Sequence, residues 1–212
     1  MNDTQMELIA GRYVKVREMG EADAALLVEW RNRDDVKKWL IQWEPLTVDA
    51  QVRWFRGARA QGDMLFMFES IQGAPIGTGS IYGLDRLRTC AQWGRLCAAR
   101  IAGSALSILE ACYLVHRVCF EILGMRRLHG SLTSDNKSSY RLNRFLGYVE
   151  EGRRRKHFAH PDGYKDVIEL GLLAEEFRQE RSSIEPKLYR HQPAPEIATA
   201  RADLIRKILS RE

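Results

Sequence analysis

The chain has 212 residues, of which 45% are hydrophobic, and a formal net charge of +5. This length and composition suit one globular domain with a substantial core and room for a short extension. No run of about 18 uncharged apolar residues occurs, so we expect no membrane-spanning helix. The first residues lack the basic and then apolar pattern of a signal peptide, which indicates a cytoplasmic protein. The modest positive charge favours anionic ligands, but aromatic residues are not interleaved with the basic runs as nucleic-acid binding would require.

The cysteine pattern speaks against two kinds of site. Cys90, Cys97, Cys112 and Cys119 form no Cys-x-x-Cys pair, and no cluster of cysteine and histidine has the spacing of zinc ligands. We therefore expect small buried thiols in a reducing compartment, with neither disulfides nor a bound metal.

The first half of the chain predicts strands interspersed with two helices. Residues 13–17 alternate between polar and apolar side chains, as in a half-buried strand. Thr47 is a candidate N-cap for a helix over residues 48–60. The apolar run 64–68 and residues 76–82 flank a Gly-Ala-Pro turn and predict a β-hairpin. The predicted elements are strands at 13–17, 64–68, 76–82 and 89–97 and helices at 22–32 and 48–60.

The longest helical pattern covers residues 105–122. Its apolar positions recur with helical spacing and predict a buried face, whereas its charged positions mark an opposite, more solvated face. The buried face comprises Ile108, Cys112, Val115, Cys119 and Ile122. The solvated face comprises Glu110, Arg117 and Glu121. The remaining predicted elements are a strand at 127–132, a helix capped by Asp135 or Asn136 that ends at Phe145, and strands at 149–158 and 164–172.

The succession of these elements predicts one mixed α/β sheet within residues 1–176. Beyond Glu176 the chain becomes more charged and contains Pro186, Pro193 and Pro195. We interpret residues 177–212 as a C-terminal extension, either an appendage or a packing arm, with a short helix over residues 197–209.

A turn of small residues separates the strand at 89–97 from the long helix. It runs Arg100-Ile101-Ala102-Gly103-Ser104-Ala105, with one arginine at its start. Such a turn directs backbone N–H groups and the positive end of a helix dipole toward an anion. Small side chains also allow a diphosphate to approach the backbone closely. The turn therefore predicts a phosphate-bearing cofactor.

This order of elements, together with the Arg-x-x-Gly-x-Ala turn, resembles the GNAT superfamily of acetyl-CoA-dependent N-acetyltransferases over residues 12–173. In that family a Gln/Arg-x-x-Gly-x-Gly/Ala turn binds the pyrophosphate of CoA, and Arg100, Gly103 and Ala105 stand at its defining positions. A second likeness is Asn136 at the start of the last helix with Leu146-Gly147-Tyr148 after its end. The resemblance implies a mostly antiparallel sheet with splayed central strands flanked by helices, and acetyl-CoA as co-substrate.

The resemblance also implies which residues bind the cofactor. Backbone N–H groups of three strand residues would hold the pantetheine arm and the thioester carbonyl, and the small-residue turn would hold the pyrophosphate. The opening of the last helix would lie against the CoA arm. The implied residues are Leu96, Cys97 and Ala98 on the strand, Arg100, Ile101, Ala102, Gly103, Ser104 and Ala105 in the turn, and Asn136 and Ser139 at the last helix.

The sequence allows three interpretations of what the protein does with acetyl-CoA. The segment Glu29-Trp30-Arg31-Asn32, with Trp39 shortly after it, resembles two groups within the superfamily. One group comprises amino-sugar N-acetyltransferases, including the pseudaminic-acid pathway enzyme that acetylates a nucleotide-linked 4-amino sugar. The other comprises ribosomal-protein N-terminal-alanine acetyltransferases. The Trp-Arg-Asn sequence favours a small-molecule amine acceptor of the first kind. A non-catalytic acyl-CoA-binding module is the third interpretation. A homodimer is a separate expectation.

Acetylation of an amine needs a base for the amine proton and a proton donor for the departing thiolate. Many GNAT enzymes carry a tyrosine seven residues after the helix-opening asparagine, where this chain has Asn143. Tyr140, one turn earlier, is therefore the candidate acid, with a packing role as the alternative. His129 is the candidate base, with a structural role as the alternative. Further candidates near strand ends and the last hairpin are His157, His160, Glu69 and Asp85.

Two further groups of side chains are candidates for ligand contact. Trp39, Trp43 and Trp54 offer stacking surface for a uracil or a sugar ring, or else pack between the first helices and the sheet. The run Arg153-Arg154-Arg155-Lys156 offers cations for phosphate groups, or else protects a solvated edge strand.

Overall fold

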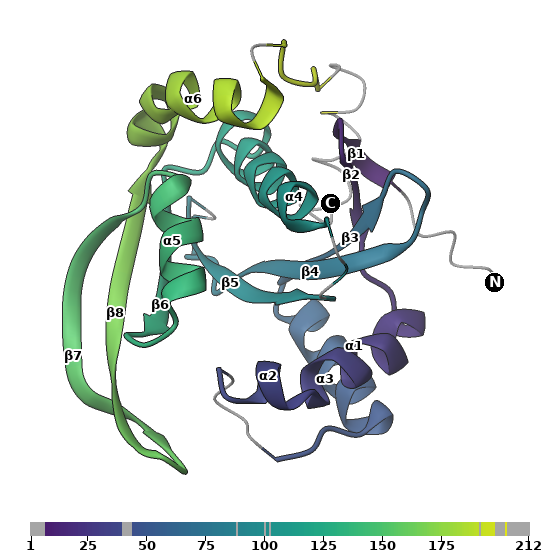
Figure 1. Cartoon of the computed structure of the whole chain (residues 1–212), viewed down its shortest axis with the longest axis vertical. Helices are drawn as coiled ribbons and strands as arrows, with labels where there is room; N and C mark the ends of the chain where they lie inside the picture. Colours follow the sequence, from purple (N-terminus) through teal and green to yellow (C-terminus); the bar gives the residue numbers. More distant parts are fainter. Residues whose placement is uncertain are drawn as a thin grey trace.

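The structure is a computed structural model of the chain, and it describes residues 7–39, 44–87, 89–99, 101, 103–190, 192–197 and 202. Within these residues one sheet has the strand order β1-β2-β3-β4-β5-β6-β8-β7, and every neighbouring pair is antiparallel except β5 and β6 (Figure 1). This is the mixed, mostly antiparallel sheet that the sequence predicted. The strands are β1 (Glu7–Ala10), β2 (Val14–Glu18), β3 (Met64–Ser70), β4 (Pro75–Tyr82), β5 (Cys90–Ala98), β6 (Arg127–Thr133), β7 (Val149–His160) and β8 (Gly163–Leu173).

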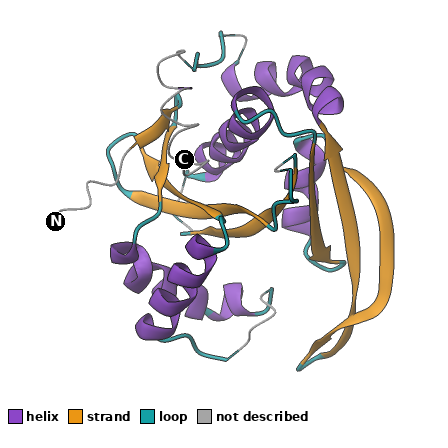
Figure 2. Cartoon of the chain, turned by 180° about the vertical axis from the view of Figure 1, so that it is seen from behind, coloured by secondary structure: helices purple, strands orange, loops and turns teal. Residues whose placement is uncertain are grey.

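Helices cover both faces of the sheet, and the β7–β8 hairpin extends beyond the other strands (Figure 2). One face packs against α1 and α3, and the other against α4, α5 and α6. Among the described residues, no helix is long and apolar enough to cross a membrane. The helices are η1 (Glu21–Asp23), α1 (Ala24–Asn32), α2 (Asp34–Lys37), α3 (Val48–Ala60), α4 (Ala105–Arg117), the π-helical turn η2 (Val118–Ile122), α5 (Lys137–Phe145) and α6 (Ala174–Tyr189).

Strand β3 is covered by helices on both faces, which explains why its apolar run contains no polar residue. Met64, Phe66 and Phe68 pack into the larger core under α4, whereas Leu65 and Met67 pack against α1 and α3 on the other face. A strand covered on both faces needs apolar side chains at every position. Cys97, Cys112 and Cys119 are buried free thiols, as predicted, and Cys90 is half-buried.

The buried face of α4 is confirmed, but its predicted solvated face is wrong for two residues. Glu110 is completely buried, and its carboxylate accepts hydrogen bonds from the backbone N–H groups of Arg12 at 2.8 Å and Tyr13 at 2.6 Å. Burial raises the pKa of Glu110. Arg117 is 7% exposed. The reason is that the β1–β2 connection and the chain beyond β8 cover this face of α4, which helical periodicity alone does not reveal.

Helix α6 begins directly after β8, so the boundary predicted after Glu176 falls inside its first turn. Phe177, Ile184, Leu188 and Tyr189 are buried in the larger core. These residues therefore act as a packing arm of the domain. The short helix predicted at 197–209 lies outside the described residues except for positions 197 and 202.

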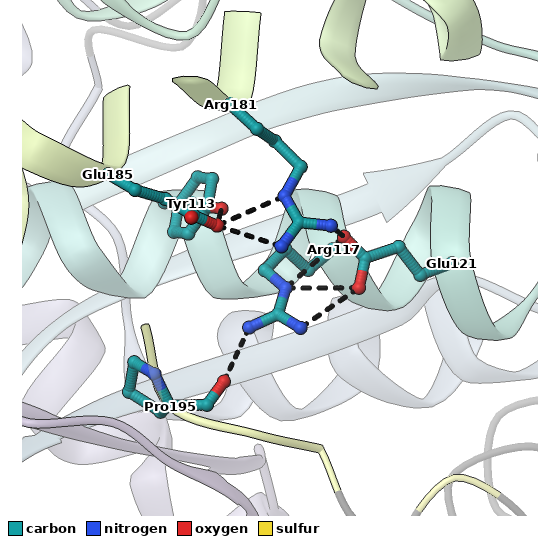
Figure 3. A network of polar contacts seen from close by, with 6 residues as sticks. All are labelled: Tyr113, Arg117, Glu121, Arg181, Glu185 and Pro195. Carbon is teal, nitrogen blue, oxygen red and sulfur yellow. Dashed lines mark hydrogen bonds and ion pairs between the residues drawn. The ribbon is translucent and has the colours of Figure 1, made fainter. Parts of the chain in front are cut away.

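A polar network ties this arm to α4 (Figure 3). The Arg181 guanidinium binds Glu121 and Glu185, each at 2.8 Å, and the Tyr113 hydroxyl also donates to Glu185. Arg117 donates to the carbonyl oxygen of Pro195 at 2.6 Å. The arm is thus fixed by charge-assisted bonds as well as by apolar burial.

Candidate active site

The central strands β5 and β6 separate after a short parallel pairing. Only three residue pairs join them, ending with Gln92 and His129. Beyond Gln92, no strand among the described residues pairs with this side of β5. Gly130 stands where the strands part, and a Cβ there would lie 2.9 Å from the carbonyl oxygen of Trp93. The sheet therefore opens into a splay whose one wall is the free edge of β5.

A β-bulge shapes this free edge. The pairing of β5 with β4 shifts between Ser80–Gly94 and Thr78–Cys97, so two residues of β5 oppose one of β4. Arg95, in the bulge, has a φ of +54°, which is uncommon for a residue other than glycine. Such strain persists only where the surroundings stabilise it.

The surroundings of Arg95 supply that stabilisation. Its guanidinium donates to Asp63 at 2.7 Å, and this carboxylate is almost fully buried. The same group lies 3.8 Å from the centre of the Tyr82 ring and 5.1 Å from the Trp54 ring, within cation–π range of both. No local sequence pattern indicates this cluster, because its members come from α3, the α3–β3 connection, β4 and β5.

The hydrogen bonds of β5 to β4 indicate which backbone amides of β5 face the splay. Ala99 donates its N–H to Ile76 of β4 at 2.8 Å. Alternation along the strand then directs the N–H groups of Ala98 and Leu96 to the free edge and that of Cys97 to β4. Cys97 instead buries its side chain against α1 and α3. Of the three predicted strand residues, two therefore present backbone donors to the splay.

The small-residue turn leads from this edge into α4. Gly103 has a φ of +81°, it is exposed, and a Cβ there would meet nothing within 4 Å. Ser104 closes the turn through its N–H and hydroxyl, which both donate to the carbonyl oxygen of Ile101, at 3.1 and 2.7 Å. Ala105 then starts a helix whose first-turn N–H groups have no intrahelical acceptor. The predicted residues Arg100 and Ala102 lie outside the described residues.

The start of α5 forms the opposite side of the same opening. Helix α4 follows the carboxyl end of β5 and α5 follows that of β6, and the two strands are parallel, so both helices begin at one edge of the sheet. Asn136 caps α5 by accepting the N–H of Ser139 at 3.2 Å. The predicted cap is confirmed.

The chain was compared with known protein families and solved structures. The family model of the acetyltransferase (GNAT) domain matches residues 14–149. The chain belongs to the GNAT acetyltransferase family. It is therefore an acetyl-CoA-dependent N-acetyltransferase.

A search of the curated proteins found no match. Among solved structures, a GCN5-related N-acetyltransferase from Brucella melitensis superposes with a TM-score of 0.71 at 19% identity, covering 93% of both chains. A spermidine N-acetyltransferase from Vibrio cholerae, in complex with CoA and spermine, has a TM-score of 0.70 at 17% identity and covers 78% of this chain and 98% of its own. At these identities the likeness concerns the fold.

In this acetyltransferase the phenol predicted as the acid points away from the splay. The Tyr140 hydroxyl donates to Glu150 of β7 at 3.2 Å, and β8 separates β7 from β6. Asn143, at the usual tyrosine position, donates its amide to the carbonyl oxygen of Ser139 at 2.8 Å. The structure thus does not bring a tyrosine of α5 to the splay.

His129 does stand at the splay. It occupies the last position of β6 that pairs with β5. Because side chains alternate along a strand and Leu128 points into the core under α4, the side chain of His129 points to the opposite face of the sheet. Burial and the nearby Arg127 lower the pKa of His129, although Glu169 and Glu151 oppose them. The imidazole is therefore neutral near pH 7, as a proton acceptor must be.

The remaining candidates have structural partners. Glu69 pairs with Arg17 at 2.6 Å, and Asp85 accepts two backbone N–H groups. The basic run lies on β7, the outer strand, where Arg153 pairs with Asp166 and Arg154 with Glu169. Trp54 packs against the core under α1 and α3, and Trp43 lies outside the described residues.

Proposed function

We propose that this acetyltransferase binds acetyl-CoA in the β5–β6 splay and acetylates the primary amine of a small molecule, a nucleotide-linked amino sugar. The observation that carries the proposal is the free edge of β5, which runs directly into the exposed turn at the start of α4. Acetyl-CoA supplies an acetyl group activated as a thioester.

The chain's own groups fit CoA in chemistry and in spacing along the chain. The amides of Leu96 and Ala98 are oriented to bind the pantetheine arm as a further strand would be bound. At the turn, Gly103 adds no side chain, and the first-turn N–H groups of α4 suit a diphosphate. Arg100 and Ala102 belong to the same proposed cradle, as do Asn136 and Ser139 at the start of α5.

We assign the proton acceptor to His129. An amine reaches the site mostly as an ammonium ion and must lose a proton before it attacks the thioester. His129 is neutral near pH 7 because burial and Arg127 lower its pKa. Tyr140 is not included as the acid, since its hydroxyl is bonded to Glu150.

The acceptor class rests on Trp39. The Lys38 ammonium lies 5.0 Å from the centre of its ring and the Lys165 ammonium lies 5.7 Å from it. The residues that follow α2 therefore meet β8 at an aromatic surface between two cations. Lys165 is held by Asp135 at 2.8 Å. An aromatic face suits a nucleobase and neighbouring cations suit a diphosphate, whereas a polycationic amine would be repelled.

A thiol-release assay with acetyl-CoA tests this function on three acceptors: a nucleotide-linked 4-amino sugar, a peptide that begins with alanine, and spermidine. We expect turnover with the sugar. Turnover with the peptide or spermidine alone would overturn the acceptor assignment. Calorimetric binding of acetyl-CoA without any turnover would favour a non-catalytic module, and the absence of binding would overturn the donor site.

A further inference from the structure

The end of α1 carries three consecutive polar residues, and two of them have structural partners. Asn32 exchanges two hydrogen bonds with the backbone of Leu46, at 2.8 and 2.9 Å. Arg33 donates to the carbonyl oxygen of Ala98 at 2.9 Å and pairs with Asp35 at 3.4 Å. These contacts hold the end of α1 beside the free edge of β5.

Arg31, the first of the three, has no such partner. Within the described part of the chain, its guanidinium takes part in no hydrogen bond and no ion pair. It is nevertheless half-buried, near Cys97 and near a second cation, Arg95. Burial, together with that neighbouring cation, lowers the pKa of Arg31.

Among the described residues, the two buried arginines each bind a carboxylate. Arg17 binds Asp23 at 2.8 Å and Glu69 at 2.6 Å. Arg117 binds Glu121 at 3.0 Å. A half-buried cation beside another cation costs free energy until an anion approaches. A bound anionic group would therefore satisfy Arg31, which has no anionic partner among the described residues.

The location of Arg31 distinguishes between the two substrates. Helices α1 and α3 cover the face of the sheet opposite α4, and the side chain of His129 projects toward that same face. The exposed turn proposed for the CoA diphosphate leads into α4 instead. A negative group near Arg31 therefore belongs to the molecule that approaches from the α1 side.

We propose that Arg31 binds an anionic group of the acceptor, a phosphate or a carboxylate, and thereby selects acidic over polycationic amines. The inference rests on the proposed function, because it requires the acceptor to enter from the α1–α3 side. Arg33 holds the neighbouring backbone in position, and Arg31 supplies a planar guanidinium that suits two oxygens of one anion.

The test compares Arg31→Ala and Arg31→Lys with the unmodified protein, using acetyl-CoA and the nucleotide-linked amino sugar. Loss of a charge-assisted bond to the acceptor should raise the acceptor KM about 30-fold in Arg31→Ala. The KM for acetyl-CoA should stay within about twofold, and lysine should restore part of the loss because it keeps the charge. Arg53→Ala, an exposed arginine on α3, is the matched control.

Two results would overturn the inference. An increase in the acetyl-CoA KM alone would assign Arg31 to the donor, and unchanged constants for both substrates would make it structural. Calorimetry with uridine diphosphate, without acetyl-CoA or turnover, provides an independent readout. If the unmodified protein acetylates no nucleotide-linked sugar, the proposed function is wrong. If uridine diphosphate also binds the unmodified protein and Arg31→Ala with equal affinity, the inference about Arg31 is wrong as well.

Discussion

Substitution of Gly103 by glutamate tests the proposed donor site with little risk to the fold. The glycine is exposed at the start of α4, and a Cβ there meets no atom within 4 Å. Its φ of +81° makes any other residue strained by about 1–2 kcal/mol. That cost falls on the turn and leaves the core contacts intact.

The expected loss of binding comes mainly from charge. For the Coulomb energy we take a separation of about 6 Å, the reach of one side chain plus one contact, between this carboxylate and each charge of a diphosphate at the turn. With an effective dielectric constant of about 40, intermediate between a protein surface and water, each pair repels by about 1.4 kcal/mol. The two pairs together cost about 3 kcal/mol, which corresponds to a weakening of more than about 100-fold in Kd.

Isothermal titration calorimetry with acetyl-CoA measures the effect directly. Gly83→Glu is the matched control, because Gly83 is also exposed, has a φ of +60° and has open space around its Cβ. It follows Tyr82, which pairs with Gln92 at the end of β5 remote from the turn. If Gly103→Glu and Gly83→Glu bind acetyl-CoA equally well, the turn does not hold the diphosphate.

Three further substitutions probe the site and the core. Burial lowers the pKa of His116, a buried residue of α4, from 6.5 to about 4. As the pH falls, the unfolded chain therefore takes up the proton before the folded protein does, and the free energy of unfolding declines between pH 6.5 and pH 4. By pH 5 this should cost about 2 kcal/mol, a pH dependence that chemical denaturation should find missing in His116→Gln. Asp63→Asn removes the carboxylate that binds Arg95 and should lower kcat about tenfold through a less ordered bulge; an unchanged kcat in a destabilised variant would contradict this role. His129→Gln should lower kcat/KM about 100-fold and abolish the fall in rate on acidification, whereas an unchanged pH profile would remove His129 as the base.

Local sequence signals predicted the elements whose causes are local. Thr47 and Asn136 cap their helices as expected, because an N-cap bonds an amide only three residues away. The helix at 48–60 agrees with α3 to the residue, and the apolar run at 64–68 lies within β3. β1 and α2 were missed, because four residues carry too little periodicity to be recognised.

Residues whose environment comes from distant segments were harder to predict. Glu110 is a charged position on a helix, and only the turn at Arg12 and Tyr13, about a hundred positions away, makes it a buried acceptor. Likewise, the direction of Tyr140 depends on Glu150, and Arg95 depends on Asp63 and Tyr82. Charge and periodicity say nothing about which partner arrives from elsewhere in the chain.

The sequence by itself determined the family, the order of most elements and the small-residue turn that opens α4, because these depend on spacing and on backbone freedom within a few residues. Only the tertiary structure decided that Leu96 and Ala98 face the splay, that Tyr140 points away from it and that Arg31 remains without a partner among the described residues. The physical reason is that strand separation, burial and charge compensation are properties of segments brought together by folding.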